Sequence, residues 1–506
     1  MAIKQQEGFE PSEVFTATAM FFSESVLTTA KSDVFNVVNF FSEAVKKLTD
    51  SEGGVVFGSG TEKAAFESYF TVDPGPFPEG WQLTNMVQGI SAALAIKKWL
   101  SSKRKNPMAQ TVYMTGKQWP SEVAPLEIEA RGFKSYNSSD IIVKPVGTPN
   151  GYYGVSLKKK PTKDSVDPTM INKAFDTVLQ DNTIFGKLKK GIVDERIKFF
   201  GNVLRDAVAE GHIHLGRLTD VKIRNNKWLF SGHSTDDRII HNMAKDRAFI
   251  DTKGSLKMPE IIGPIKDPKG RKNPGKHNTN NPDDWGKAAP GNPTTWNNYG
   301  DKALGKSELS SRKDTMRKFV NNQLGKSDCP LYGAMLEVMN EYADVFGEQL
   351  VSVTLRTDIL KEIEKKLGVK RFGELDIGFA LVTGIGKAPK VATSQQIAKK
   401  DKEIKKTLLD VPAGKAYDIE CVLEGLNHLD KKSGRQKDNY RFVLKEKEEE
   451  HVDDDGPAKL IFDLLKNDTP ILNMELRFKG GFTSQPQFFG YMTKEFKSVL
   501  TTGKCL

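Results

Sequence analysis

The stretch that most constrains the fold of this chain is a hairpin near residue 150. Two apolar segments rich in β-branched residues, 139–144 and 152–160, flank a Gly-Thr-Pro-Asn-Gly loop at 147–151. Two strand-like segments joined by a short loop containing Gly and Pro are typical of an antiparallel hairpin. Because helical patterns precede and follow it, the sequence predicts an α/β or α+β fold.

The register of this hairpin decides which side chains share a face of the sheet. With a five-residue loop, Asp140 lies opposite Lys158, and both share a face with Ser156 because side chains alternate along a strand. A two-residue Asn-Gly turn would instead place Asp140 opposite Pro161. In the first register a carboxylate and an ammonium meet. A carboxylate can hold a hard divalent cation, and a lysine can stabilise an attacking water or the charge on a phosphate.

This arrangement resembles the PD-(D/E)XK, or restriction-endonuclease-like, nuclease superfamily. In that family an Asp opens one strand of a hairpin, and an acidic residue, any residue and a Lys lie on the next. Asp140 matches the Asp and Lys158 matches the Lys, whereas Ser156 stands where Asp or Glu is usual. The resemblance covers about residues 110–180. It implies a restriction-endonuclease-like core, with a mixed central sheet flanked by helices.

The resemblance also implies a function, namely hydrolysis of DNA with Mg²⁺ or Mn²⁺ as cofactor. Asp140 would then be a metal ligand, Ser156 a weak or water-mediated ligand, and Lys158 the charge stabiliser. In this family an acid from a helix before the Asp strand can join the metal site. A helix predicted to open at Trp119 makes Glu122 the candidate, the alternative being a solvated helix charge. A further helix predicted within 167–179 would pack behind the lysine strand.

Charge is distributed unevenly along the 506 residues. Residues 1–80 carry a net charge of −7, residues 81–320 a net charge of +17, and residues 321–506 no net charge. The positive excess therefore coincides with the segment that holds the hairpin. A basic surface around a phosphodiester site favours a nucleic acid partner, and DNA is the expected kind. The alternative is a basic surface that is merely solvated.

Composition divides the chain into four parts. These are an acidic helical region (1–80), a nuclease-like core (81–258), a basic linker or loop rich in Gly, Pro and Asn (259–305), and a mixed α/β region (306–506). The Phe-rich helices expected at 11–48 could be part of the core, which is the favoured interpretation. They could also bind a second copy of the chain or a phage structural partner.

A strand expected at 471–481 carries a second group of charges. Glu475, Arg477 and Lys479 share one face by their spacing of two. They could contribute a carboxylate and phosphate-binding cations to a site. They could equally form the solvated face of an edge strand, which lysine protects from pairing, and this second interpretation is favoured.

The remaining features bear on the compartment. Three widely spaced cysteines argue against a disulfide framework, and neither a secretory signal nor an apolar membrane span is apparent. We therefore expect a soluble protein with no membrane partner. The sequence resembles a bacteriophage gene product, which implies the host cytoplasm or the virion.

The alternative to a nuclease is a non-enzymatic virion or nucleic-acid-binding protein with a decayed nuclease fold, which Ser156 favours.

Overall fold

The computed structural model groups the described residues into two compact units, each built around its own sheet. The residues it describes are 9–32, 34–49, 54–68, 80–165, 168–179, 184–192, 194–195, 199, 218–224, 227–232, 240–241, 261–262, 329–368, 375–387, 411–433, 439–445, 459–477 and 487–502.

The first unit draws on three stretches of chain, Met1–Met170, Val351–Gln436 and Lys494–Leu506. The units therefore interleave along the sequence, whereas the division by composition follows the chain. The elements of the first unit are α1 (Pro11–Ala19), α2 (Glu24–Ala30), α3 (Val34–Thr49), β1 (Val55–Val56), α4 (Gly60–Ser68), α5 (Gly80–Ser102), β2 (Ala109–Met114), the 3-10 helix η1 (Ala124–Leu126), β3 (Ile141–Pro145), β4 (Gly151–Lys160), α12 (Ile359–Leu367), β10 (Asp376–Ile385), β11 (Lys415–Asp418), α15 (Ile419–Ser433) and α16 (Lys494–Thr502).

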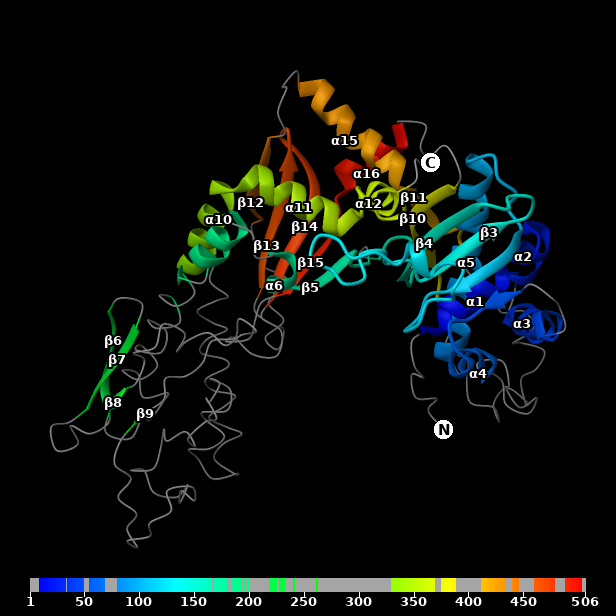
Figure 1. The fold of residues 1–506 in the computed structure, drawn as a ribbon, viewed down its shortest axis with the longest axis horizontal. Coiled ribbons are helices and arrows are strands. Elements are labelled where there is room, and N and C mark those ends of the chain that lie inside the picture. The colour runs from blue at the N-terminus through cyan, green and yellow to red at the C-terminus, as the bar shows by residue number, and fades with distance from the viewer. Residues whose placement is uncertain are drawn as a thin grey trace, which may run out of the picture. The chain divides into compact units, whose positions relative to one another are not determined.

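These strands form one six-stranded sheet in the order β1-β2-β3-β4-β10-β11 (Figure 1). β1 is parallel to β2 and β4 is parallel to β10, while the other neighbours are antiparallel. The sheet is therefore mixed, and the prediction of a mixed α/β protein is confirmed. Because β4 and β10 run in the same direction, their carboxyl ends lie at the same edge of the sheet.

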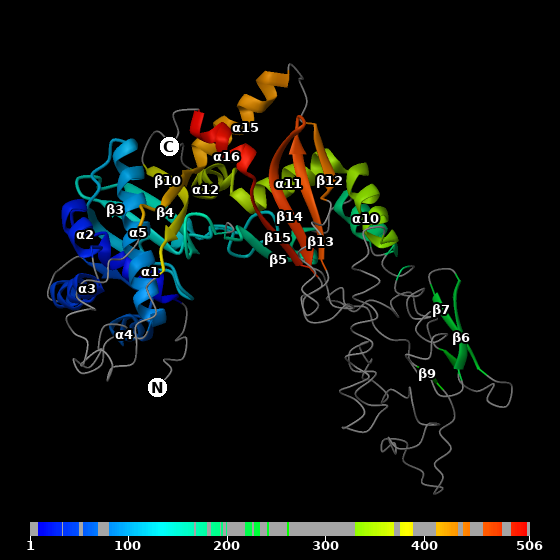
Figure 2. The same cartoon turned by 180° about the vertical axis from the view of Figure 1, so that it is seen from behind.

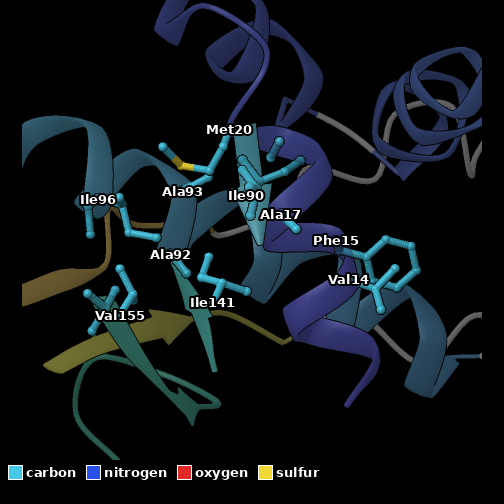
Figure 3. Packing of buried hydrophobic residues seen from close by; sticks show 14 of the residues in the cluster. Val14, Phe15, Ala17, Met20, Ile90, Ala92, Ala93, Ile96, Ile141 and Val155 are labelled. Carbon is cyan, nitrogen blue, oxygen red and sulfur yellow. The ribbon is translucent and has the colours of Figure 1, made fainter. Parts of the chain in front are cut away.

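The N-terminal helices pack on this sheet through α5. Figure 3 shows Ile90 of α5 lying beside Ala17 of α1, with Ile141 of β3 and Val155 of β4 below. Phe15 and Phe41 belong to the same buried cluster, with their ring centroids 4.7 Å apart. These side chains are among the apolar residues that the sequence places on the helices of residues 11–48. The favoured interpretation, that these helices are part of a core, is confirmed.

The second unit comprises Ile171–Leu350 and Lys437–Thr493. Its larger sheet has the order β12-β13-β14-β15-β5 and is antiparallel throughout (Figure 2). The elements are β5 (Ile171–Ala174), α6 (Phe175–Val178), β6 (Leu218–Arg224), β7 (Lys227–Gly232), β8 (Ile240–His241), β9 (Ile261–Ile262), α10 (Pro330–Glu341), α11 (Ala343–Leu355, which runs into the first unit), β12 (Tyr440–Leu444), β13 (Lys459–Lys466), β14 (Thr469–Arg477) and β15 (Gln487–Met492).

Three predictions of local structure are wrong. The helix predicted within 167–179 is the strand β5 followed by the single turn α6, because β5 pairs with β15 and this pairing overrides the local helical pattern. The strand around Glu475 is not at an edge, since β13 and β15 pair with both of its sides. Glu122 lies in a turn before η1 and not in a helix.

The predicted hairpin is present, but its register differs by two residues. Ile141 pairs with Val155 and Val143 with Tyr153, whereas the predicted register pairs Ile141 with Leu157. The regular pairing ends at Ile141, because the Asp140 amide donates to the carbonyl of Val155, the residue that already lies opposite Ile141. Asp140 is therefore not paired opposite Lys158. The cause is a turn over residues 145–148, in which the Thr148 amide donates to the Pro145 carbonyl at 3.2 Å. Gly147 is the third residue of this turn, and its φ of 75° suits that position. The loop thus has five residues, but it begins at 146 and not at 147. A shift of two keeps the side chains of the paired residues on their predicted faces.

Several expectations fall on residues outside the described part of the chain. Lys479 lies there, as does the basic segment 259–305 except for β9. Within the described residues, no helix combines the length and the apolar character needed to cross a bilayer.

Candidate active site

Asp140 is held rigidly at the start of β3. Its amide donates to the Val155 carbonyl at 2.8 Å, and its carbonyl accepts from the Thr115 amide at 3.3 Å. The carboxylate accepts a hydrogen bond from the Leu157 amide. Backbone bonds on both sides therefore fix where the Asp140 carboxylate points.

Ser156 and Lys158 lie on β4 next to Asp140. Ser156 is 1% exposed and hydrogen-bonds to the Asp140 carboxylate. Lys158 is two residues further along the same face, and its charge attracts the Asp140 carboxylate. The structure therefore brings together three of the four predicted site residues, despite the different register.

Two further carboxylates approach Asp140 from the start of α1. Glu13 lies in the first turn of this helix and accepts a hydrogen bond from the Glu10 amide at 3.0 Å. Both Glu10 and Glu13 interact electrostatically with Asp140, and Glu10 also forms an ion pair with Lys159. We refer to Glu10, Glu13 and Asp140 as the carboxylate cluster.

Two carboxyl groups of the cluster, those of Glu13 and Asp140, have raised pKa values. Burial raises the pKa of Glu13 well above its ordinary value, and the negative charge of Asp140 is the next cause. Burial likewise raises the pKa of Asp140, and Glu10 adds to this, while Lys158, the Leu157 amide and Ser156 act in the opposite direction. Like charges are therefore crowded together in a half-buried place, an arrangement that is frequent at functional sites.

Glu122 lies elsewhere on the hairpin. It accepts hydrogen bonds from Lys144 and from the Tyr152 hydroxyl, both at 2.9 Å. A hydrogen bond from Tyr113 is the main cause that lowers the pKa of Glu122, and Lys144 contributes in the same direction. Lys144 is four residues along β3 from Asp140, roughly 13 Å. Glu122 is therefore an ionised, paired surface residue that the structure does not bring to Asp140.

The carboxylate oxygens of the cluster are ligands of the kind that a hard divalent cation prefers. Mg²⁺ is usually held by one or two carboxylates together with water and substrate phosphates. Asp140 and Glu13 supply two carboxylates, and a cation would offset the burial and the repulsion that raise their pKa values. Among the residues that the structure describes, no group of three or more His, Cys, Asp or Glu side chains is arranged to hold a metal ion. Any cation would thus depend on water and substrate for the rest of its coordination.

Comparison with known proteins adds no assignment, since no protein-family model, curated protein or solved structure matches this chain.

Glu13 was not among the predicted site residues, because more than 120 residues separate it from Asp140. The available signal was local, since Glu10-Pro11-Ser12-Glu13 has the pattern of a helix start, with Pro at the first helical position. That pattern predicts the helix but gives no information on which strand its first turn approaches. The packing of α1 on α5 supplies that information.

Proposed function

We propose that this chain is a divalent-metal-dependent nuclease that hydrolyses phosphodiester bonds in DNA. The observation that supports it best is the convergence of Asp140, Glu13 and Lys158 at one end of the mixed sheet. Two carboxylates with raised pKa values beside an ammonium group form a typical site for charge-based phosphate chemistry.

In this proposal each residue has a defined role. Asp140 and Glu13 would hold Mg²⁺ or Mn²⁺, which supplies an activated water and neutralises phosphate charge. Ser156 and the Leu157 amide orient the Asp140 carboxylate through their hydrogen bonds. This proposal replaces the predicted role of Ser156 as a ligand with a positioning role, and the predicted role of Glu122 with Glu13.

Lys158 would act on the phosphate itself. Hydrolysis forms a bond between a water oxygen and phosphorus and breaks the bond from phosphorus to the leaving oxygen, which takes up a proton. Negative charge spreads over the phosphate oxygens during this exchange. The Lys158 ammonium group, beside Asp140, would stabilise that charge where it develops.

Two coarser features agree with this proposal. The mixed sheet is the type that the resemblance implies. The net charge of +17 over residues 81–320 favours attraction of a polyanion to the part of the chain that contains Asp140 and Lys158.

A second candidate function is a non-enzymatic nucleic-acid-binding or virion protein that retains this architecture. Ser156 is the observation that favours it. Its buried side chain occupies the position of the expected second carboxylate and hydrogen-bonds to Asp140. A site reduced to such internal hydrogen bonds could persist for structural reasons alone.

A plasmid-cleavage assay separates the two candidates. Supercoiled DNA is incubated with the full chain in Mg²⁺, in Mn²⁺ and in EDTA, beside the variant Asp140→Asn. The nuclease proposal predicts nicked or linear DNA with either metal, and none in EDTA or with the variant. Wild-type protein that binds DNA and RNA but leaves both intact in either metal would instead favour the structural candidate.

A further inference from the structure

A buried carboxylate outside the carboxylate cluster belongs to Glu62, in the first turn of α4. Its side chain is 3% exposed. Its Oε1 atom accepts hydrogen bonds from the backbone amides of Lys117 at 2.9 Å and of Gln118 at 3.2 Å. Its Oε2 atom is also buried and has no hydrogen-bond partner among the described residues. The hydrogen bonds that the carboxylate accepts therefore all come from one place, the loop that follows β2.

This loop, residues 115–118, is joined to the start of β3. The Thr115 amide donates to the Asp140 carbonyl at 3.3 Å, and the Thr115 hydroxyl donates to the Ser139 carbonyl. Asp140 is thus held by the residue that opens the loop, while the amides that bind the Glu62 carboxylate close it. Hydrogen bonds and a short length of backbone therefore connect Glu62 to Asp140.

The same loop also contacts the chain that leads into α1. A side chain at Gly116 would come within 2.5 Å of the Phe9 ring and within 2.8 Å of Glu62 Oε1, so both groups lie against this glycine. Phe9 is 2% exposed and directly precedes Glu10. The Glu10 amide in turn donates to the Glu13 carboxylate. The loop that Glu62 holds therefore contacts both chain segments that supply the carboxylate cluster.

Helix α4 is itself anchored beside this loop. Phe66 lies four residues after Glu62 and thus on the same face of the helix. Its ring packs on the ring of Phe57, with centroids 4.9 Å apart, and the Phe57 ring packs on that of Phe9 at 6.1 Å. These three aromatic rings hold α4 against the segment that leads into α1. Packing therefore determines where the Glu62 carboxylate lies.

The position of this carboxylate is unfavourable in one respect, because its Oε2 atom is buried without a partner. Natural proteins retain such unfavourable groups mainly at functional sites. We propose that Glu62 is a positioning residue, which holds the loop of residues 115–118 and, through this loop, the Asp140 carboxylate. This inference rests on the proposed function, in which Asp140 binds the cation. Glu62 itself touches neither the cation nor the DNA, so it acts on the reaction only through Asp140.

The test compares the steady-state cleavage of a fluorescent oligonucleotide by the full chain and by three variants. Glu62→Leu removes both hydrogen bonds but keeps a side chain of similar size. It should lower kcat by at least ~10-fold and change KM little, since a misplaced Asp140 affects the transition state. Glu62→Gln should restore most of the rate, because its amide oxygen can accept the same two hydrogen bonds.

The matched control is Glu67→Leu, the same change at a half-buried position of the same helix, and it should cleave like wild type. A normal kcat in Glu62→Leu, or no recovery in Glu62→Gln, would overturn the inference.

Amide hydrogen exchange separates this inference from the proposed function, because it requires no cleavage. In Glu62→Leu, exchange should become faster at Lys117, where a hydrogen bond is lost. It should also become faster at Thr115 and Leu157, whose amides donate to the Asp140 carbonyl and carboxylate. Faster exchange at all three amides, in a chain whose wild type cleaves no DNA, would support the positioning role and contradict the nuclease. Faster exchange confined to Lys117, in a chain whose wild type cleaves normally, would do the reverse.

The wild-type chain provides a measurement that does not depend on the folding of any variant. In native-state exchange at increasing urea concentration, the Lys117, Thr115 and Leu157 amides should open with one common free energy, because the loop and Asp140 are held together. Opening of the Lys117 amide at a separate, lower free energy would overturn the inference.

Discussion

The two units of this protein differ in how their buried and half-buried carboxylates are compensated. In the second unit, Glu475 of β14 is paired with Arg477 on its own strand and with Lys459 of β13, 3.5 Å away. Asp463 of β13 accepts a hydrogen bond from Asn473 at 2.8 Å. In the first unit, Glu13 and Asp140 are crowded against each other, and their pKa values rise.

The difference shows how a structural charge can be distinguished from a functional one. Glu475 is compensated by cations of the same sheet, and Arg477 is further held by the Phe489 ring, 4.3 Å from its guanidinium carbon. The charges on this face of the second sheet are therefore compensated without a ligand. Ionisation of Glu13 and Asp140, by contrast, is less favourable in the folded protein than in water, and a bound cation would offset this cost. The four predictions that follow test this contrast, beginning with the largest expected effect.

The first prediction concerns catalysis. Asp140→Ala and Lys158→Ala should each lower the rate of Mg²⁺-dependent DNA cleavage by at least ~10²-fold, because each removes charge from the reacting site and not from the core. Glu475→Gln should leave this rate within about twofold. Initial rates of plasmid nicking measure both effects, with circular dichroism as the check on folding. Equal losses in all three variants would contradict the division between the two sheets.

The second prediction reverses the order of effects for stability. Glu475→Ala leaves Arg477 and Lys459 without their carboxylate and should destabilise the fold by about 2 kcal/mol. Glu13→Gln relieves repulsion and should leave the free energy of unfolding unchanged or raise it by about 1 kcal/mol at neutral pH. Urea denaturation measures both. A Glu13→Gln variant less stable than Glu475→Ala would show that Glu13 has a structural role.

Sequence predicted the hairpin of the first unit well, because its information is local. Alternating β-branched residues and a Gly- and Pro-containing loop predicted both strands and the proximity of Asp140, Ser156 and Lys158. The register needed one further detail, the positive φ of Gly147, which decides where the turn begins. Because side chains alternate with period two, an error of two residues left the paired side chains on their predicted faces.

The parts that sequence could not predict are those that depend on distant packing. Glu13 approaches Asp140 because α1 packs on α5, and no local pattern reveals that packing. The central position of β14 likewise depends on β13 and β15, so its alternating charges could not reveal whether the strand lies at an edge. The spacing of residues along a strand shows which side chains share a face, but it does not show which strands lie on either side.

The third prediction concerns Ser156. Ser156→Ala removes the hydrogen bond to Asp140 and should cost about 1 kcal/mol of stability. Ser156→Asp places another carboxylate beside that of Asp140, so it should destabilise the metal-free protein and recover stability when Mg²⁺ is added. Melting temperatures with Mg²⁺ and with EDTA measure this recovery. Mg²⁺ that stabilises Ser156→Asp no more than Ser156→Ala would argue against a cation beside Asp140.

The fourth prediction is the smallest effect and concerns pH. The pKa values of Glu13 and Asp140 are raised in the folded state, so these two groups bind more protons in the folded protein than in the unfolded chain once the pH exceeds about 4. Their contribution to stability should therefore fall as the pH rises from about 4 through the raised pKa values. Glu13→Gln should flatten this dependence. Urea midpoints between pH 4.5 and 7.5 measure it, and identical slopes for variant and wild type would contradict the raised pKa of Glu13.

The most direct test of the carboxylate cluster as a cation site is Mn²⁺ binding, followed by electron paramagnetic resonance. Wild-type protein should remove free Mn²⁺ from solution, and its affinity should rise with pH because binding displaces protons from Glu13 and Asp140. Asp140→Asn and Glu13→Gln should both lose this binding, whereas Glu475→Gln should retain it. Wild-type binding that is absent, or that both cluster variants keep unchanged, would contradict the assignment.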